Sequence, residues 1–274
     1  EYERSYVPKT TAPPEFGKRL VEFTRFVEES SDEEFAEKIS GYVDLPAFLK
    51  FTALHAVLSH LDSFLLRGHN FYIYLPESTG KFHWIPWDVN STFAGHRSAG
   101  SASQQTDLSI GQPYADGVRL LSRILKIKSA RAEYRKQVEA VLAGPFKPET
   151  IQARMKKVLE TIGTAVAKDR NTDPARFNAN FTISKPNKSP GQQDARPGTE
   201  DRDSARIGMQ QKPLLAEFIA ARTSSILSQL TDGREGYVPR SSTRRSRGDR
   251  SRRPEGSSRR PSRSPFPRRP GKEN

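Results

Sequence analysis

Three polar residues, Asp62, Asn70 and Asp88, have the types and the spacing from which a chemical site could be built. Carboxylate and amide oxygens are ligands that hard divalent cations prefer, and a carboxylate can also orient and deprotonate a hydroxyl group. Two apolar, aromatic-rich runs flank the turn residues Pro76–Gly80, which predicts a β-hairpin with strands at 71–75 and 81–85. The open ends of a hairpin are neighbours, so we expect the Cα atoms of Asn70 and Asp88 within about 10 Å of each other. We expect Asp62, at the end of the preceding helix, to lie beside them.

Helices are predicted for most of the remaining chain, because apolar residues recur at helical spacing. The expected helices cover 16–29, a short segment that begins at the Ser31–Glu34 capping box, 46–66, 118–127, 130–142, 148–168 and 212–230. In the helix at 148–168 the inward side chains are expected to be Ile151, Met155, Val158, Leu159 and Ile162. Two polar stretches, 94–117 and 169–207, lack periodicity and are expected to be flexible loops. The predicted fold is α+β: a mostly helical lobe with a central hairpin, spanning residues 1–235.

Composition excludes several kinds of site. The sequence has no cysteine, which rules out disulfides, thiolate metal sites and cysteine nucleophiles. No apolar run approaches the roughly 20 residues needed to span a bilayer, and no signal peptide is recognisable. Hydrophobic residues make up 34% of the chain and the mean hydropathy is -0.74, which indicates that part of the chain lacks a packed core.

The part without a core is predicted to be the C-terminal tail, residues 236–274, which is rich in Arg, Ser and Pro. From Arg240 onward it carries twelve arginines and one lysine against three acids, a charge of +10, so only +3 of the total +13 belongs to the rest of the chain. Such tracts are typically disordered, and they bind polyanions through phosphate contacts and counterion release. Polyanion binding and a merely solubilising role are both consistent with this composition.

The central segment closely resembles the spore-coat protein H (CotH) kinase family, whose members are atypical protein kinases. The resemblance rests on Asp62, the strand Asn70–Tyr74, Gly80-Lys81-Phe82, and the run Ile85-Pro86-Trp87-Asp88-Val89-Asn90-Ser91-Thr92-Phe93. The Ile-Pro-Trp-Asp part is the specific one. The match is good over residues 16–93 and looser over 118–230, where the last helix is similar to the closing helix of the family.

The resemblance implies a kinase-like C-terminal lobe and assigns roles to three residues. Asp62 corresponds to the catalytic-loop aspartate, Asn70 to the asparagine that follows it, and Asp88 to the metal-binding aspartate. It also implies that ATP, with Mg²⁺ or Mn²⁺, phosphorylates Ser or Thr of protein substrates such as coat or surface proteins, at the cell surface or outside the cell. Phosphoryl transfer needs these residue types, because it depends on positioning and on neutralising charge.

Two departures from the family pattern affect this expectation. Asn90 stands where family members usually have a second acid, and only about 60 residues precede Asp62, with no Gly-rich phosphate loop among them. We therefore expect this chain to be a fragment that lacks the nucleotide-covering lobe and is a weak enzyme by itself. The alternative is a non-catalytic coat or cell-surface structural protein with the same fold.

For the tryptophans, the histidines and Arg222, a structural role is favoured over, or weighed equally with, the alternative. Trp84 and Trp87 are expected to pack in the core and the hairpin. His55 and His60, five residues apart, are expected on different faces of a helix, which argues against a shared metal. Arg222 is expected either to anchor the last helix or to be solvated.

Overall fold

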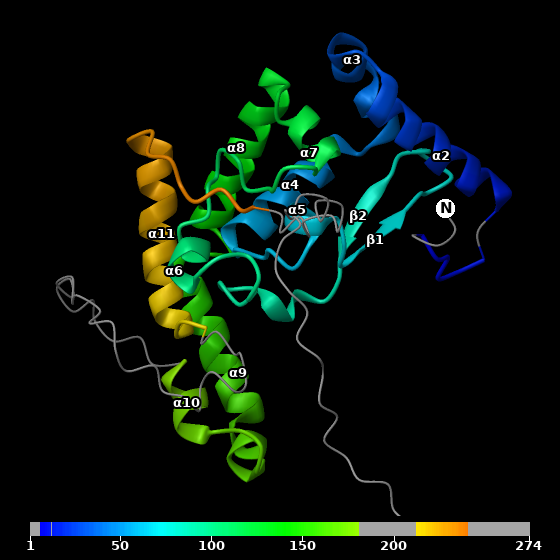
Figure 1. Cartoon of the computed structure of the whole chain (residues 1–274). Coiled ribbons are helices and arrows are strands. Elements are labelled where there is room, and N and C mark those ends of the chain that lie inside the picture. Colours follow the sequence, from blue (N-terminus) through cyan, green and yellow to red (C-terminus); the bar gives the residue numbers. More distant parts are fainter. Residues whose placement is uncertain (1–5, 12, 181–211, 241–274) are drawn as a thin grey trace, which may run out of the picture. The chain divides into compact units, whose positions relative to one another are not determined.

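The computed structural model describes residues 6–11, 13–180 and 212–240 (Figure 1). Its elements are α2 (Pro14–Glu29), α3 (Asp32–Tyr42), α4 (Leu45–Val57), α5 (Phe64–Arg67), β1 (Phe71–Tyr74), β2 (His83–Pro86), the 3₁₀ helix η1 (Val89–Ser91), α6 (Ala102–Thr106), α7 (Arg119–Ile124), α8 (Lys128–Ala143), α9 (Pro148–Lys168), α10 (Pro174–Ala179) and α11 (Leu215–Thr231). Helices dominate and the sheet is a small antiparallel pair, so the α+β class is confirmed. Most of the loop predicted at 169–207 and nearly all of the Arg-rich tail lie outside the described residues.

Helix α4 is the centre of the core and packs along α8 and beneath β2. Ala47 and Lys50 lie on a narrow exposed side of the helix, and buried residues occupy most of the rest of its circumference. The buried residues are Phe48, Leu49, Phe51, Thr52, Ala53, His55, Ala56 and Val57. The helix begins where the sequence predicts, because the Asp44 side chain accepts a hydrogen bond from the Ala47 backbone N–H.

Helix α4 ends at Val57, whereas the sequence predicted a helix continuing to residue 66. The Leu58 carbonyl accepts a hydrogen bond from the Phe93 backbone N–H at 2.8 Å, and Ser59 adopts a left-handed conformation with φ 48°. The chain turns there and begins the short helix α5, which Gly68 ends with φ 64°. Asp62 therefore lies in the turn between α4 and α5 and not at a helix end.

The hairpin forms in the predicted place. Phe71 pairs with Pro86 and Tyr74 with His83, and the backbone N–H of Gly80 donates to the Pro76 carbonyl at 2.9 Å to close the turn. The strands are one residue shorter or shifted relative to the prediction, within the usual uncertainty of element ends. The hairpin is the structural frame on which Asn70 and Asp88 sit.

One face of the hairpin packs on the core and the other is exposed. Trp84 packs edge-on against Phe48 at 4.8 Å between ring centroids and against Phe64 at 6.0 Å, so its predicted packing role is confirmed. The prediction for Trp87 was only partly right, because this ring packs on Tyr72 at 5.1 Å yet remains 56% exposed. The alternation of a strand places successive residues on opposite faces, which separates the two tryptophans.

The segment 94–117 has more structure than expected. It contains α6, and the side chain of Gln105 is fully buried inside the loop. The amide Nε2 of Gln105 donates to the carbonyls of His96 and Gly100, at 2.7 and 2.8 Å, and its Oε1 accepts from the His96 N–H at 3.1 Å. These hydrogen bonds replace regular backbone pairing and fix the position of His96.

Helix α11 is held to the core by a buried arginine. Arg222 has no exposed surface, and its guanidinium donates to the carbonyls of Ala56 at 2.9 Å, Val57 at 3.2 Å, Thr106 at 3.1 Å and Leu108 at 2.6 Å. Two of these carbonyls lie in the last turn of α4, where helical backbone pairing runs out; the Ala56 carbonyl also accepts from the Ser59 N–H at 3.1 Å. Of the two roles considered for Arg222, the structure supports the anchor.

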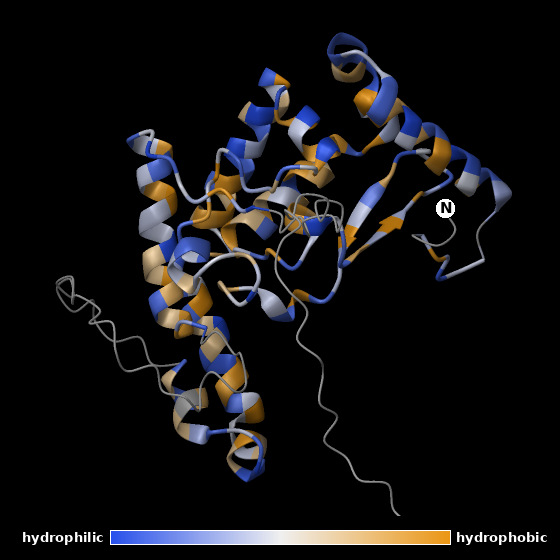
Figure 2. Cartoon of the chain, in the orientation of Figure 1, coloured by the Kyte–Doolittle hydropathy of each residue, from blue (hydrophilic) through white to orange (hydrophobic). Residues whose placement is uncertain are grey.

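Helix α9 is less buried than its sequence pattern predicts. Met155 is its buried residue, whereas Val158 is 45% and Ile162 41% exposed, so their predicted inward position was wrong. In Figure 2 the apolar residues of α9 stand out as bands between polar ones. The amphipathic pattern predicted the helix correctly, but only its first half reaches the core in the described part of the chain.

Tyr237, which lies just beyond the predicted lobe boundary at 235, contacts the lobe. Tyr237 pairs with Leu108 in an isolated bridge, in which Ser109 N–H donates to the Tyr237 carbonyl at 2.7 Å. Among the helices of the described ranges, none is long and apolar enough to cross a membrane.

Candidate active site

Asp62 is the most highly connected of the three predicted site residues. Its Oδ1 accepts a hydrogen bond from His69 Nε2 at 2.7 Å and lies 3.6 Å from His96 Nδ1. Its Oδ2 accepts a long hydrogen bond from the Ser91 hydroxyl, at 3.4 Å. The two histidines come from different loops, so the carboxylate is oriented by tertiary structure.

The surroundings of Asp62 favour its ionised form. Burial raises the pKa of the carboxyl group, but the hydrogen bond from His69, the charges of His96 and His69, and the hydrogen bond from Ser91 together lower the pKa below its ordinary value. Burial in turn lowers the pKa of His96, with Asp62 acting in the opposite direction. At neutral pH the site therefore presents an oriented carboxylate.

Asn70 connects Asp62 to the hairpin. Its side-chain Nδ2 donates to the Asp62 backbone carbonyl at 2.8 Å, and its own carbonyl accepts from the Trp87 N–H at 3.1 Å. Asp88 is the next residue after Trp87, so the two open ends of the hairpin do adjoin as predicted. The structure thus brings Asp62 and Asn70 into direct contact and places Asp88, which is exposed, one residue from the Asn70–Trp87 pair.

Backbone strain is concentrated around this site. Among the described residues, every non-glycine residue with positive φ falls between positions 59 and 94. They are Ser59, Asn70, Asp88, Phe93 and Ala94. The left-handed conformation is unfavourable for residues with a Cβ, and such residues gather at functional sites because the surrounding structure must hold them there. This concentration is a second reason, besides the side-chain contacts, to treat the segment as the candidate site.

The site offers oxygen ligands that suit a divalent cation, but too few of them to complete its coordination. In the described ranges, no group of three or more His, Asp or Glu side chains is arranged to hold a metal ion. A magnesium ion bound with a nucleotide needs only one or two carboxylates, since phosphate oxygens and water supply its other ligands. The exposed carboxylate of Asp88 fits that limited role.

Two buried histidines precede Asp62: His55 lies in the last turn of α4 and His60 in the turn that follows it. The rings of His55 and His60 stack with centroids 5.0 Å apart, so the prediction that they lie on different helix faces was wrong. The reason is the early end of α4, which folds His60 back over His55. His55 Nδ1 donates to the Phe51 carbonyl at 2.8 Å, whereas neither ring nitrogen of His60 has a hydrogen-bond partner in the part of the chain that the structure describes.

This pair predicts a pH-dependent stability. Burial lowers the pKa of both His55 and His60 to about 4, so the folded protein cannot take up the protons that the unfolded chain binds below about pH 6.5. The free energy of unfolding should therefore fall between pH 7.5 and 5.5, by about 1.4 kcal/mol for each histidine. Urea unfolding at the two pH values measures this.

Carboxylates with lowered pKa, such as Asp62, lose their contribution only near pH 4 and below, so they do not interfere in that interval. Replacing both buried histidines with leucine should remove most of the dependence and leave the contribution of His96, whose pKa burial also lowers, and the control variant His83→Gln should keep it. Equal stability of the wild-type protein at pH 7.5 and 5.5 would contradict the assignment.

The sequence analysis missed four participants, His69, Ser91, His96 and Lys212. His69 and Ser91 adjoin motif residues, so their proximity to Asn70 and Asn90 was an available signal. His96 and Lys212 gave no such signal, because only tertiary contacts bring them next to Asp62 and Asn90. Lys212 donates to the Asn90 carbonyl across 122 positions of sequence.

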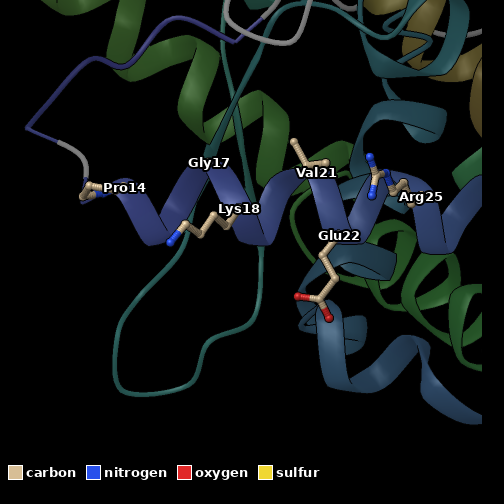
Figure 3. Close-up of a pocket in the computed structure, with 6 residues that line it drawn as sticks. All are labelled: Pro14, Gly17, Lys18, Val21, Glu22 and Arg25. Atoms are coloured by element: carbon tan, nitrogen blue, oxygen red, sulfur yellow. The ribbon is translucent and has the colours of Figure 1, made fainter.

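An open hollow of about 530 Å³ lies elsewhere, along α2. It is lined by Pro14, Gly17, Lys18, Val21, Glu22 and Arg25 (Figure 3). All of these residues come from a single helix, so the hollow has no facing wall, and no predicted site residue lines it. It does not compete with the Asp62 site as a candidate.

The fold and the site together define an α+β protein whose helical lobe presents an oriented carboxylate at the open end of a hairpin. The family described as CotH kinase protein matches residues 2–193, well over half of the 274 residues, and the chain belongs to this family. It is also 27% identical to the inner spore coat protein H of Bacillus subtilis (strain 168) over 152 aligned residues. The aligned region covers 53% of this chain. The chain spans 38% of the length of that relative.

Proposed function

We propose that this chain carries the acceptor side of a protein kinase active site, which transfers the terminal phosphoryl group of ATP to a serine or threonine hydroxyl. The observation that carries the proposal is the carboxylate of Asp62, which accepts a hydrogen bond from His69 while Asn70 holds the Asp62 backbone beside the two strained ends of the hairpin. Membership of the CotH kinase protein family supports the same reaction.

Asp62 has the geometry of a residue that orients the acceptor. Its Oδ1 faces the two histidines, and its Oδ2 faces the Ser91 hydroxyl at 3.4 Å. A substrate hydroxyl could replace that long contact and donate to the same oxygen. As the hydroxyl oxygen bonds to the phosphorus and the bond to the ADP oxygen breaks, the hydroxyl proton passes to Asp62.

Asn70 and Asp88 have supporting roles in this proposal. Asn70 keeps the Asp62 backbone in place through its amide. Asp88 would hold Mg²⁺ or Mn²⁺ bound with ATP, and such a cation supplies neutralisation of the phosphate charge. The backbone of Asp88 is left-handed, which fixes the direction in which the chain turns out of the hairpin.

The substrates are proposed to be proteins of a spore coat or a cell surface, because the relative is an inner spore coat protein. Incubation of the complete protein with labelled ATP, Mg²⁺ or Mn²⁺ and coat protein extracts tests the reaction. Phosphoserine or phosphothreonine in the products is the expected result. Absence of transfer, with the fold intact, would favour a non-catalytic coat or surface protein.

The 274-residue chain should transfer phosphate much more slowly than a version of the protein that also carries a nucleotide-covering lobe. Phosphates carry several negative charges, and placing them beside Asp62 and Asp88 is unfavourable unless cations cover the other side. The measurement compares initial rates of the two proteins at equal concentration and saturating ATP. Equal rates would show that this chain already contains everything that the reaction needs.

A further inference from the structure

Lys212 reaches the candidate active site from a distant part of the chain. It precedes α11, and its ammonium donates a hydrogen bond to the backbone carbonyl of Asn90, in the 3₁₀ helix that follows Asp88. Helix α11 is itself fixed to the core by Arg222. The position of Lys212 therefore depends on the packing of the closing helix.

Gly95 makes room for this side chain. A Cβ atom at position 95 would lie 2.2 Å from Lys212 Cε and 2.8 Å from its Nζ. Any larger residue would therefore displace the end of the lysine side chain, which is flexible enough to move. The absence of a side chain at Gly95 is what permits the ammonium to lie against Asn90.

A short chain of contacts links the ammonium to Asp62. The Ser91 hydroxyl lies 2.9 Å from the Asn90 side-chain oxygen and 3.4 Å from Asp62 Oδ2. Lys212 thus places a positive charge on Asn90, one residue before Ser91, whose hydroxyl faces the candidate base Asp62. Burial lowers the pKa of Lys212, which reflects its partial removal from water.

We propose that Lys212 binds the terminal phosphate of the nucleotide at this site. The inference rests on the proposed function and adds to it a cation that the sequence motif does not supply. An ammonium group is a compact charge with three donors, so it can contact a phosphate oxygen while it keeps or exchanges its bond to Asn90. Its bond to the Asn90 carbonyl, one residue before Ser91, puts that charge near the place where the transferred group would meet the acceptor hydroxyl.

The test compares the binding of two nucleotides to the complete protein in the presence of Mg²⁺. AMP-PNP has a terminal phosphate group and ADP does not. Lys212→Met should weaken AMP-PNP binding by about tenfold or more, because a hydrogen bond to a charged group is lost, and should leave ADP binding nearly unchanged. Lys212→Arg should retain part of the affinity, since the charge remains with a different geometry.

Gly95→Ala provides an independent test that leaves every charge in place. It should reduce AMP-PNP binding in the same direction, and the double variant Gly95→Ala, Lys212→Met should be no worse than Lys212→Met alone. The matched control is Lys50→Met, on the exposed face of α4, with thermal unfolding recorded for all variants.

The outcomes separate the two proposals. If Lys212→Met and Gly95→Ala bind AMP-PNP as tightly as the wild-type protein while Asp88→Ala loses binding, the role of Lys212 is wrong and the kinase proposal stands. Equal weakening of AMP-PNP and ADP would likewise overturn the assignment to the terminal phosphate. A wild-type protein that binds neither nucleotide would overturn both.

Discussion

Replacing Asp88 with alanine in the complete protein should reduce phosphate transfer from labelled ATP by a factor on the order of 10² to 10³. In the proposed function the exposed carboxylate of Asp88 anchors the nucleotide-bound cation, and Asn90 does not provide a second acid. Without the anchor, the phosphate charge is no longer neutralised in the correct position. Initial rates of autophosphorylation and of substrate phosphorylation measure the loss.

Asp62→Asn should cause a loss of similar size for a different reason. The amide can still occupy the space beside His69, but it cannot accept the proton of the acceptor hydroxyl. Nucleotide binding should therefore change less in this variant than in Asp88→Ala. Wild-type activity of the Asp88→Ala variant would overturn the assignment of the site. The control is Asp116→Ala, which replaces an exposed acid in the loop before α7 and should leave the activity unchanged.

Arg222→Met should destabilise the folded protein by about 2–6 kcal/mol. Methionine preserves much of the buried volume but leaves the carbonyls of Val57 and Thr106 without the hydrogen bonds that Arg222 donates, at a cost of about 1–3 kcal/mol each, whereas the Ala56 carbonyl still accepts from the Ser59 N–H at 3.1 Å. The Leu108 carbonyl keeps a partner, because Gln229 Nε2 also donates to it at 3.2 Å. Chemical denaturation monitored by tryptophan fluorescence gives the free energy of unfolding.

The buried guanidinium has no carboxylate among its four acceptors, and burial lowers its pKa to about 9. It nevertheless remains charged at neutral pH, and charged donors make stronger hydrogen bonds. Arg154→Met, on the exposed side of α9, is a matched control that should change stability little. A loss in Arg222→Met no larger than in this control would show that the four hydrogen bonds contribute little.

The hairpin and its turn could be predicted from sequence because their signals are local. Two apolar, aromatic-rich runs define the two strands, and Pro76 and Gly80 have the backbone preferences that the turn requires. The start of α4 at Asp44 and the end of α5 at Gly68 are also local features, since a cap depends on one or two side chains. Asn70 and Asp88 adjoin as predicted for the same reason.

The end of α4 could not be predicted, because the sequence around Ser59 contains no residue that breaks a helix. Two contacts from distant parts of the chain hold the turn: the Phe93 N–H donates to the Leu58 carbonyl, and the Ser59 hydroxyl donates to the Gln105 carbonyl at 2.7 Å. Such contacts outweigh the small differences in helix propensity between ordinary residues.

The same limit applies to the site. The sequence by itself determined which oxygen ligands adjoin the hairpin, since they belong to one continuous segment. Only the tertiary structure decided that His96 faces Asp62, that Lys212 lies against Asn90, and that Arg222 is buried. Each of these depends on packing between segments far apart in the chain, and no local preference for a backbone conformation specifies which distant residue a side chain will meet.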